Sequence, residues 1–170
     1  MRFTNTVMID RPISEVFAFI SNFENMPKWN YFVVDTTNES PPGIGVGTTY
    51  RQRRKTDSQR YAVTEFEPER RVAVRTLPPA ADLLMTFTFE SSGRGTRLTD
   101  EWVLDTGLPR WLEVFGGARI RSAVRGNLAK LKELLETGRV RLQDGRVETI
   151  LLDRGLCGGS HEEGSQGATP

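Results

Sequence analysis

A single long amphipathic segment near the C-terminal end constrains the fold of this chain more than any other feature. From residue 118 to 138, apolar side chains recur every three or four positions, the spacing that places them along one face of an α-helix. This stripe consists of Ile120, Val124, Leu128, Leu131 and Leu135. Together with the residues before it, the helix would have about 20–27 residues and a length of about 30–40 Å, enough to cross a small domain. Gly138 supplies its C-terminal stop.

Most of the chain before this helix has the alternation of short strands. Residues 12–23 are the exception, because they have helical spacing with a proline in the first turn, and a second short turn follows at 25–29. Strand-like segments lie at 2–9, 31–37, 46–55, 59–66, 71–77, 83–91 and 96–105. Tight turns such as residues 92–95 join them, which predicts an antiparallel meander with one apolar face. The predicted fold class is α+β: a curved antiparallel sheet of about seven strands around the long C-terminal helix, with two short helices after the first strand.

Glycines interrupt the long helix at two places. Gly116 and Gly117 stand where the helix is expected to begin. They form either a hinge that lets residues 111–115 act as a lid, or a plain junction between loop and helix. Gly126 lies in the middle of the helix, where it either allows a close approach to the sheet or enlarges the space beside it.

Composition excludes several classes of protein. The 170 residues carry 23 basic and 22 acidic side chains, so a net charge of +1 gives no case for binding nucleic acid. No run approaches the ~20 apolar residues of a membrane span, and the first residues lack the apolar region of a signal peptide. With a single cysteine, Cys157, a reducing compartment is favoured. We therefore expect a cytoplasmic protein without stable membrane insertion, whose oligomeric state is not indicated.

The chain changes character after Gly138. Residues 139–152 have roughly strand-like spacing around Asp144 and Gly145, which predicts a weak hairpin. Residues 155–170 contain too few apolar side chains to pack and are predicted to be disordered. We therefore divide the chain into a folded domain at 1–138 and a C-terminal tail at 139–170.

Five short stretches occur in a characteristic order within the folded domain. They are the strand, helix and tryptophan of 7–29, Gly-Val-Gly-Thr at 45–48, the turn at 65–71, Gly-Thr-Arg-Leu-Thr at 95–99, and the helix ending at 127–136. Together they resemble the polyketide cyclase/dehydrase and lipid-transport family of the SRPBCC superfamily, which includes START-like and birch-pollen-allergen-like proteins. The resemblance implies a helix-grip fold with an elongated cavity between the sheet and the C-terminal helix. These motifs shape turns and packing, so they indicate a fold more than a function.

Aromatic and apolar side chains on the inward-facing strand positions are the candidate lining of such a cavity. Each alone is more often a core residue, but as a set, given the fold, they favour a ligand cavity. The candidate ligand-binding residues are Trp29, Phe32, Tyr50, Tyr61, Met85, Phe87, Phe89, Trp102, Trp111, Phe115 and Ile120.

Asp100 is the sharpest single candidate for chemistry. If Leu98 and Trp102 face inward, strand alternation turns Asp100 inward too. A carboxylate buried without a partner is costly or becomes protonated, and Arg54 could pair with it. The alternative is that a bulge or a sheet edge places Asp100 in water.

Three functions follow from these observations. The leading one is binding or transport of a small hydrophobic ligand, such as a lipid, an isoprenoid or a polyketide-like molecule, without catalysis. The second is an aromatase/cyclase-type enzyme in which Asp100, Arg54 and Tyr50 or Tyr61 move protons. The absence of histidine outside residue 161 weakens it and argues against a metal site, and no nucleotide-binding motif is present, so no cofactor is expected. The third is a module that binds a partner segment in the same groove.

Overall fold

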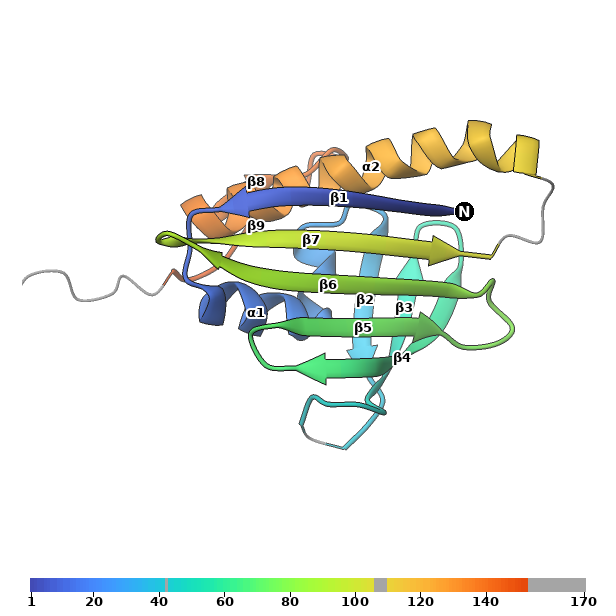
Figure 1. Cartoon of the computed structure of the whole chain (residues 1–170), viewed down its shortest axis with the longest axis horizontal. Coiled ribbons are helices and arrows are strands. Elements are labelled where there is room, and N and C mark those ends of the chain that lie inside the picture. Colours follow the sequence, from blue (N-terminus) through green and yellow to red (C-terminus); the bar gives the residue numbers. More distant parts are fainter. Residues whose placement is uncertain (42, 106–109, 153–170) are drawn as a thin grey trace, which may run out of the picture.

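A half-barrel sheet curving around helices forms the body of the protein (Figure 1). The structure is a computed structural model that describes residues 1–41, 43–105 and 110–152, with only the backbone described for 110–116. Its elements are β1 (Arg2–Ile9), α1 (Ile13–Ser21), the 3₁₀ helix η1 (Phe23–Lys28), β2 (Val33–Asn38), β3 (Thr49–Arg54), β4 (Ser58–Glu67), β5 (Arg71–Thr76), β6 (Leu83–Ser92), β7 (Gly95–Leu104), α2 (Arg110–Thr137), β8 (Arg139–Arg141) and β9 (Val147–Thr149).

The seven strands of the large sheet are all antiparallel, in the order β1-β7-β6-β5-β4-β3-β2. Strands β2 to β7 form a meander, and the first strand of the chain, β1, pairs with β7 at one edge of the sheet. Irregularities in register between Val33 and Asp35 and between Val63 and Glu65 accompany the curvature of the sheet. The predicted fold class, a curved sheet of about seven strands with a long C-terminal helix, is confirmed.

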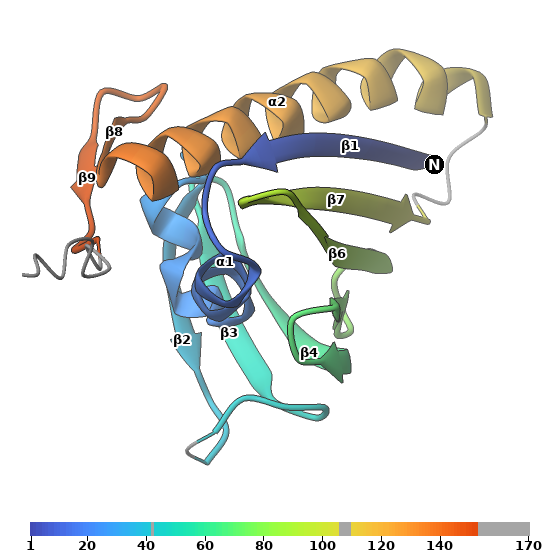
Figure 2. The same ribbon diagram turned by 60° about the vertical axis from the view of Figure 1, so that its left-hand side comes forward.

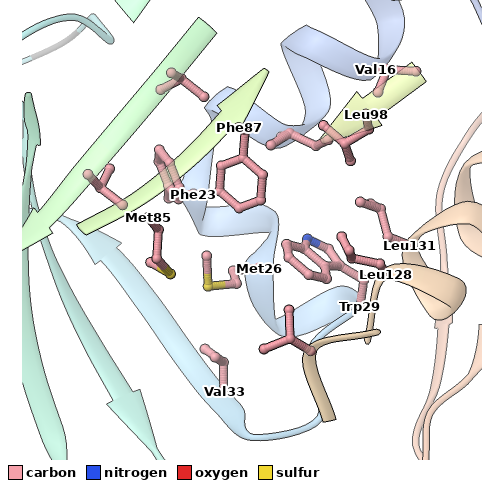
Figure 3. Packing of buried hydrophobic residues seen from close by; sticks show 14 of the residues in the cluster. Val16, Phe23, Met26, Trp29, Val33, Met85, Phe87, Leu98, Leu128 and Leu131 are labelled. Carbon is pink, nitrogen blue, oxygen red and sulfur yellow. The ribbon is translucent and has the colours of Figure 1, made fainter. Parts of the chain in front are cut away.

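Helices cover the concave side of this sheet. Figure 2 shows α2 running alongside β1, and α1 lying inside the curve of the sheet. The apolar stripe of α2 faces inward, and Leu128, Leu131 and Leu135 are buried there. Figure 3 shows Trp29, at the end of η1, between Met26 and the α2 residue Leu128. The core therefore joins η1, the sheet and the second half of α2.

Three element boundaries differ from the sequence prediction. The second strand begins at Val33 rather than residue 31, because a turn stabilised by the Phe32 N–H donating to Asn30 Oδ1 (3.1 Å) comes first. The third strand begins at Thr49 rather than residue 46, after a loop in which Gly47 has a φ of 90°. Helix α2 begins at Arg110 and runs through residues 116 and 117, so the expected start of the helix at these glycines is wrong.

A two-stranded hairpin, β8 and β9, follows α2. The helix ends at Gly138, whose φ of 76° is favourable for glycine and whose N–H donates to the Leu134 carbonyl (2.8 Å). Val140 and Leu142 are buried in the core, at 1% and 3% exposure. These two side chains of the hairpin therefore pack against the core, whereas the expected disorder at 155–170 falls outside the described residues.

Candidate functional site

A cavity of about 1260 Å³ lies between the concave face of the sheet and α2. The segment from η1 to β2 forms one side, strands β3, β4, β6 and β7 form the floor, and the loop from residue 77 to 81 and the α2 residues 119–127 complete the wall. The volume exceeds the ~300–1,000 Å³ typical of small-molecule sites. The space is therefore large enough for a ligand with several rings or a long chain.

The predicted lining residues fall into two groups. Six of them lie on the cavity wall, namely Trp29, Phe32, Met85, Phe87, Trp102 and Ile120. Phe32 does so at the rim, with 41% of its surface exposed. Tyr50, Tyr61 and Phe89 are not on the wall. The side chains of Trp111 and Phe115 lie outside the described residues.

The three residues away from the wall are held by the N-terminal helices. Phe23 packs edge-on against the rings of Tyr50 (5.5 Å) and Tyr61 (5.6 Å), and Phe17 packs against Phe89 (5.1 Å). Strand alternation places all inward aromatic residues on one face, but it does not tell which part of that face α1 and η1 fill. The part of this face that α1 and η1 cover belongs to the hydrophobic core, and the uncovered part lines the cavity.

Asp100 lies on the cavity wall and is buried, with 2% of its surface exposed. It sits in the middle of β7, opposite Asn5 of β1 and Phe87 of β6, and both registers are continuous. Trp102 Nε1 lies 2.9 Å from each carboxyl oxygen. Because β7 is neither bulged nor an edge strand here, the alternative that Asp100 faces water is wrong.

Burial raises the pKa of Asp100 to about 7, and the hydrogen bond from Trp102 opposes this rise only in part. The carboxyl is thus divided between its acid and its carboxylate form near neutral pH. An acid or base with a pKa near the working pH is suited to proton transfer.

The residues expected to act with Asp100 contact other partners or lie away from the cavity wall. Arg54 donates from Nε to Asp57 Oδ1 at 2.6 Å, and this local carboxylate in the β3–β4 turn replaces the expected partner Asp100. Tyr50 and Tyr61 are completely buried off the wall, and burial raises the pKa of both hydroxyls. Of the four candidate catalytic residues, Asp100 and Arg54 border the cavity, and the expected pair between them is wrong.

Side-chain amides form one polar part of the wall, and sequence reasoning did not identify them. Gln59 Nε2 donates to Gln52 Oε1 (2.9 Å), and Gln52 Nε2 contacts Met26 Sδ (2.9 Å). Each glutamine lies two residues from a buried tyrosine on the same strand. Strand alternation could therefore have predicted that both side chains point inward. These amides can orient a polar group without adding charge.

A second amide network crosses from η1 to the C-terminal hairpin. Asn127 Nδ2 donates to Asn30 Oδ1 (3.0 Å), and Gln143 Nε2 donates to Asn127 Oδ1 (3.3 Å). All three residues border the cavity. No sequence signal links residue 143 to this site, because the contact depends on how the hairpin folds back.

Within residues 1–41, 43–105 and 110–152, no group of three or more His, Cys, Asp and Glu side chains is placed to hold a metal ion. In the same part of the chain, no helix is long and apolar enough to cross a membrane.

Solved structures with the same fold come from several sources. A protein from Thermus thermophilus has a TM-score of 0.65 and 17% identity, with 78% of this chain and 95% of that chain covered. The Aha1 dimer from Colwellia psychrerythraea has a TM-score of 0.63 and 18% identity, with coverages of 81% and 98%. DynU16, from the dynemicin biosynthetic locus, has a TM-score of 0.62 and 20% identity, with coverages of 81% and 48%. At these identities the likeness establishes the fold alone.

Sequence comparison identifies the family. No curated protein matches the chain significantly. The family model described as polyketide cyclase/dehydrase and lipid transport, however, matches residues 1–136. This match covers most of the chain and agrees with the half-barrel sheet, the long C-terminal helix and the cavity between them. The chain therefore belongs to the polyketide cyclase/dehydrase and lipid-transport family, within the SRPBCC superfamily.

Proposed function

We propose that this protein binds a small hydrophobic ligand, such as a lipid, an isoprenoid or a polyketide-like molecule, in the cavity between the sheet and α2. The cavity itself carries the proposal, because aromatic and aliphatic side chains form much of its wall. The polar part of the wall consists of amides, hydroxyls, the carboxyls of Asp57 and Asp100, and arginines such as Arg54 and Arg119. The family description and the dynemicin-locus neighbour support a ligand of this class. Burial of apolar ligand surface would supply the affinity, at about 25 cal/mol per Å².

Native mass spectrometry of the freshly purified protein, followed by organic extraction, tests this proposal. We expect either a stoichiometric apolar adduct or saturable binding of the neutral fluorescent probe N-phenyl-naphthylamine. Ala123→Trp on α2 should weaken binding, because Ala123 borders the cavity and the indole would occupy part of it. Ala129→Trp on the exposed side of α2 is the matched control and should retain binding. Failure to detect adduct or probe, or equal binding by both variants, contradicts the proposal.

A second function, an aromatase/cyclase or dehydratase without metal or nucleotide cofactor, is favoured by one observation. Asp100 is a buried carboxyl on the cavity wall with a pKa of about 7. Such a group can remove a proton from the carbon next to a ligand carbonyl and return it to a departing hydroxyl. A C–H and a C–O bond break, a C=C bond forms, and water leaves.

Asp100→Asn separates the two functions. A protein that only binds should retain its affinity for an apolar ligand within a few-fold, and neither form should turn over a β-hydroxy ketone. An enzyme should lose turnover while binding persists. Product analysis by mass spectrometry, with wild type and variant at equal ligand occupancy, distinguishes these results.

A further inference from the structure

The carboxyl of Asp100 has hydrogen-bonding capacity that the protein does not fill. A carboxylate offers about four lone-pair positions, yet within the described residues only the Nε1–H of Trp102 donates to it. In the same part of the chain no cation pairs with it, since Arg54 is held by Asp57. Leaving a buried polar group unsatisfied costs free energy, so a donor supplied by a ligand would stabilise this site.

The side-chain amides on the wall are engaged with neighbouring side chains. Gln59 donates to Gln52, which contacts Met26, while Gln143 and Asn127 donate along the chain that ends at Asn30. These amides therefore bond chiefly to one another, whereas Asp100 is open to a further partner.

Aromatic surfaces surround the open carboxyl. Phe87 lies directly across from Asp100 on β6, and Trp102 follows two residues along β7 and stacks on Phe3 (5.6 Å, 19°). Both Phe87 and Trp102 border the cavity. A planar ligand packed here would bring a substituent on its edge within reach of the carboxyl.

We propose that Asp100 determines ligand specificity by recognising a hydroxyl group and by rejecting a carboxylate; the inference rests on the proposed ligand-binding function. A hydroxyl donates to the carboxylate form and accepts from the acid form, so it suits Asp100 on both sides of its pKa. A ligand carboxylate would instead place a like charge beside the carboxylate form of Asp100 in a medium of low dielectric constant. The rejection should therefore be strongest above the pKa of Asp100, where the carboxylate form prevails. The ligand class is thereby narrowed to hydroxylated aromatic or alicyclic molecules, in preference to fatty acids.

Three two-ring probes test this inference with the full chain at pH 8.5, where Asp100 is mainly carboxylate: naphthalene, 2-naphthol and 2-naphthoate. Wild type should bind 2-naphthol about tenfold more tightly than naphthalene, equivalent to about 1.4 kcal/mol. It should bind 2-naphthoate more weakly than 2-naphthol. Isothermal titration calorimetry or displacement of N-phenyl-naphthylamine gives the dissociation constants.

Variants assign the preference to Asp100. Asp100→Leu should remove the preference for 2-naphthol and leave naphthalene binding within about threefold. Thr86→Val, which removes a buried hydroxyl on β6 that is not part of the cavity wall, is the control and should retain the preference. If Asp100→Leu does not fold, Asp100→Asn decides, because its amide still bonds a hydroxyl but should bind 2-naphthoate more tightly than wild type does.

The outcomes separate the two proposals. Equal binding of naphthalene and 2-naphthol by wild type, or an unchanged preference in Asp100→Leu, overturns the inference while ligand binding stands. Unchanged rejection of 2-naphthoate in Asp100→Asn overturns it as well. If no probe binds and N-phenyl-naphthylamine also fails, the proposed function falls and the inference falls with it.

Discussion

Burial of the Asp100 carboxyl makes the stability of the fold depend on pH. Its pKa is about 7 in the folded protein, above the value near 3.9 of an exposed aspartate. Between these values the folded state binds more protons than the unfolded state does, so this group lowers the free energy of unfolding as the pH rises. The contribution is fully present below about pH 4 and is lost through pH 7, by up to about 1.4 kcal/mol per pH unit.

Urea unfolding of wild type and Asp100→Asn at pH 5 and pH 8 checks this prediction. The variant should lack the loss between the two pH values that Asp100 causes. Comparison with the variant removes the contributions of other groups that titrate in this range. Asp144 contributes no change between pH 5 and pH 8, because hydrogen bonds from Lys55 and Arg146 outweigh the effect of its burial and lower its pKa to about 2. Parallel pH dependence in the two proteins would show that Asp100 titrates normally.

Gly95 is required by a close approach of two backbones. A Cβ at this position would lie 2.6 Å from the carbonyl oxygen of Ile9, and a backbone atom cannot move aside cheaply. We expect Gly95→Ala to lower the free energy of unfolding by about 1–3 kcal/mol. Gly45→Ala is the control, since no atom lies within 4 Å of its Cβ position. Equal midpoints of urea unfolding for the two variants would refute the contact.

Gly126 lowers the helix propensity of α2, and no close approach to the sheet requires it. Its Cβ position lies 3.3 Å from Gln143 Nε2, the mobile end of a side chain, and not beside a strand. Gly126→Ala should therefore raise the free energy of unfolding by up to about 1 kcal/mol through helix propensity. Ala129→Gly, on the exposed side of α2, should lower it by a similar amount. Destabilisation by Gly126→Ala would mean that Gln143 cannot move.

Periodicity predicted the elements better than their ends. The alternation around Phe87 and Leu98 and the helical stripe of α2 were sufficient for the fold, since each buries one face. The strand beginning at Val33 was misplaced because aromatic residues 31 and 32 have strand propensity, yet a turn anchored by Asn30 holds them. Strand propensity does not include such a local hydrogen bond from the backbone to an asparagine side chain.

The same limit applies to the candidate site. Alternation correctly placed Asp100 and Trp102 on the inner face, because β7 is paired without interruption on both sides. Alternation could not tell that Phe87 lines the cavity while Tyr61 lies in the core, because that difference depends on where η1 packs.

For the whole molecule, we propose that the C-terminal hairpin belongs to the folded domain, because one of its leucines packs in the core. Leu142 is 3% exposed, whereas Leu151 is fully exposed. Leu142→Ala should lower the free energy of unfolding by about 2–5 kcal/mol, the usual range for a large-to-small substitution in a core. Leu151→Ala is the matched control and should have no effect. Equal stability of the two variants by urea unfolding would place the domain boundary at residue 138 after all.

The hairpin also fixes the rim of the cavity. Lys55 donates to Asp144 (2.8 Å), and Arg146 Nη2 donates to the carbonyls of Tyr31 (3.2 Å) and Val33 (3.3 Å). These contacts join a segment beyond the family match at 1–136 to the wall formed by η1 and β2. We propose that the ligand-binding domain extends through this hairpin.

The second amide network, which runs from Asn30 through Asn127 to Gln143, couples the hairpin to the cavity. The neighbouring Leu142 N–H donates to the Arg146 carbonyl within the hairpin (2.8 Å), so this amide exchanges only when the hairpin itself opens. A ligand that reduces the motion of the cavity wall also restrains Gln143, which borders the cavity. The hairpin should therefore open less often when the cavity is occupied. Slowed hydrogen exchange at the last strands would then report occupancy of a site formed mainly by residues far earlier in the sequence.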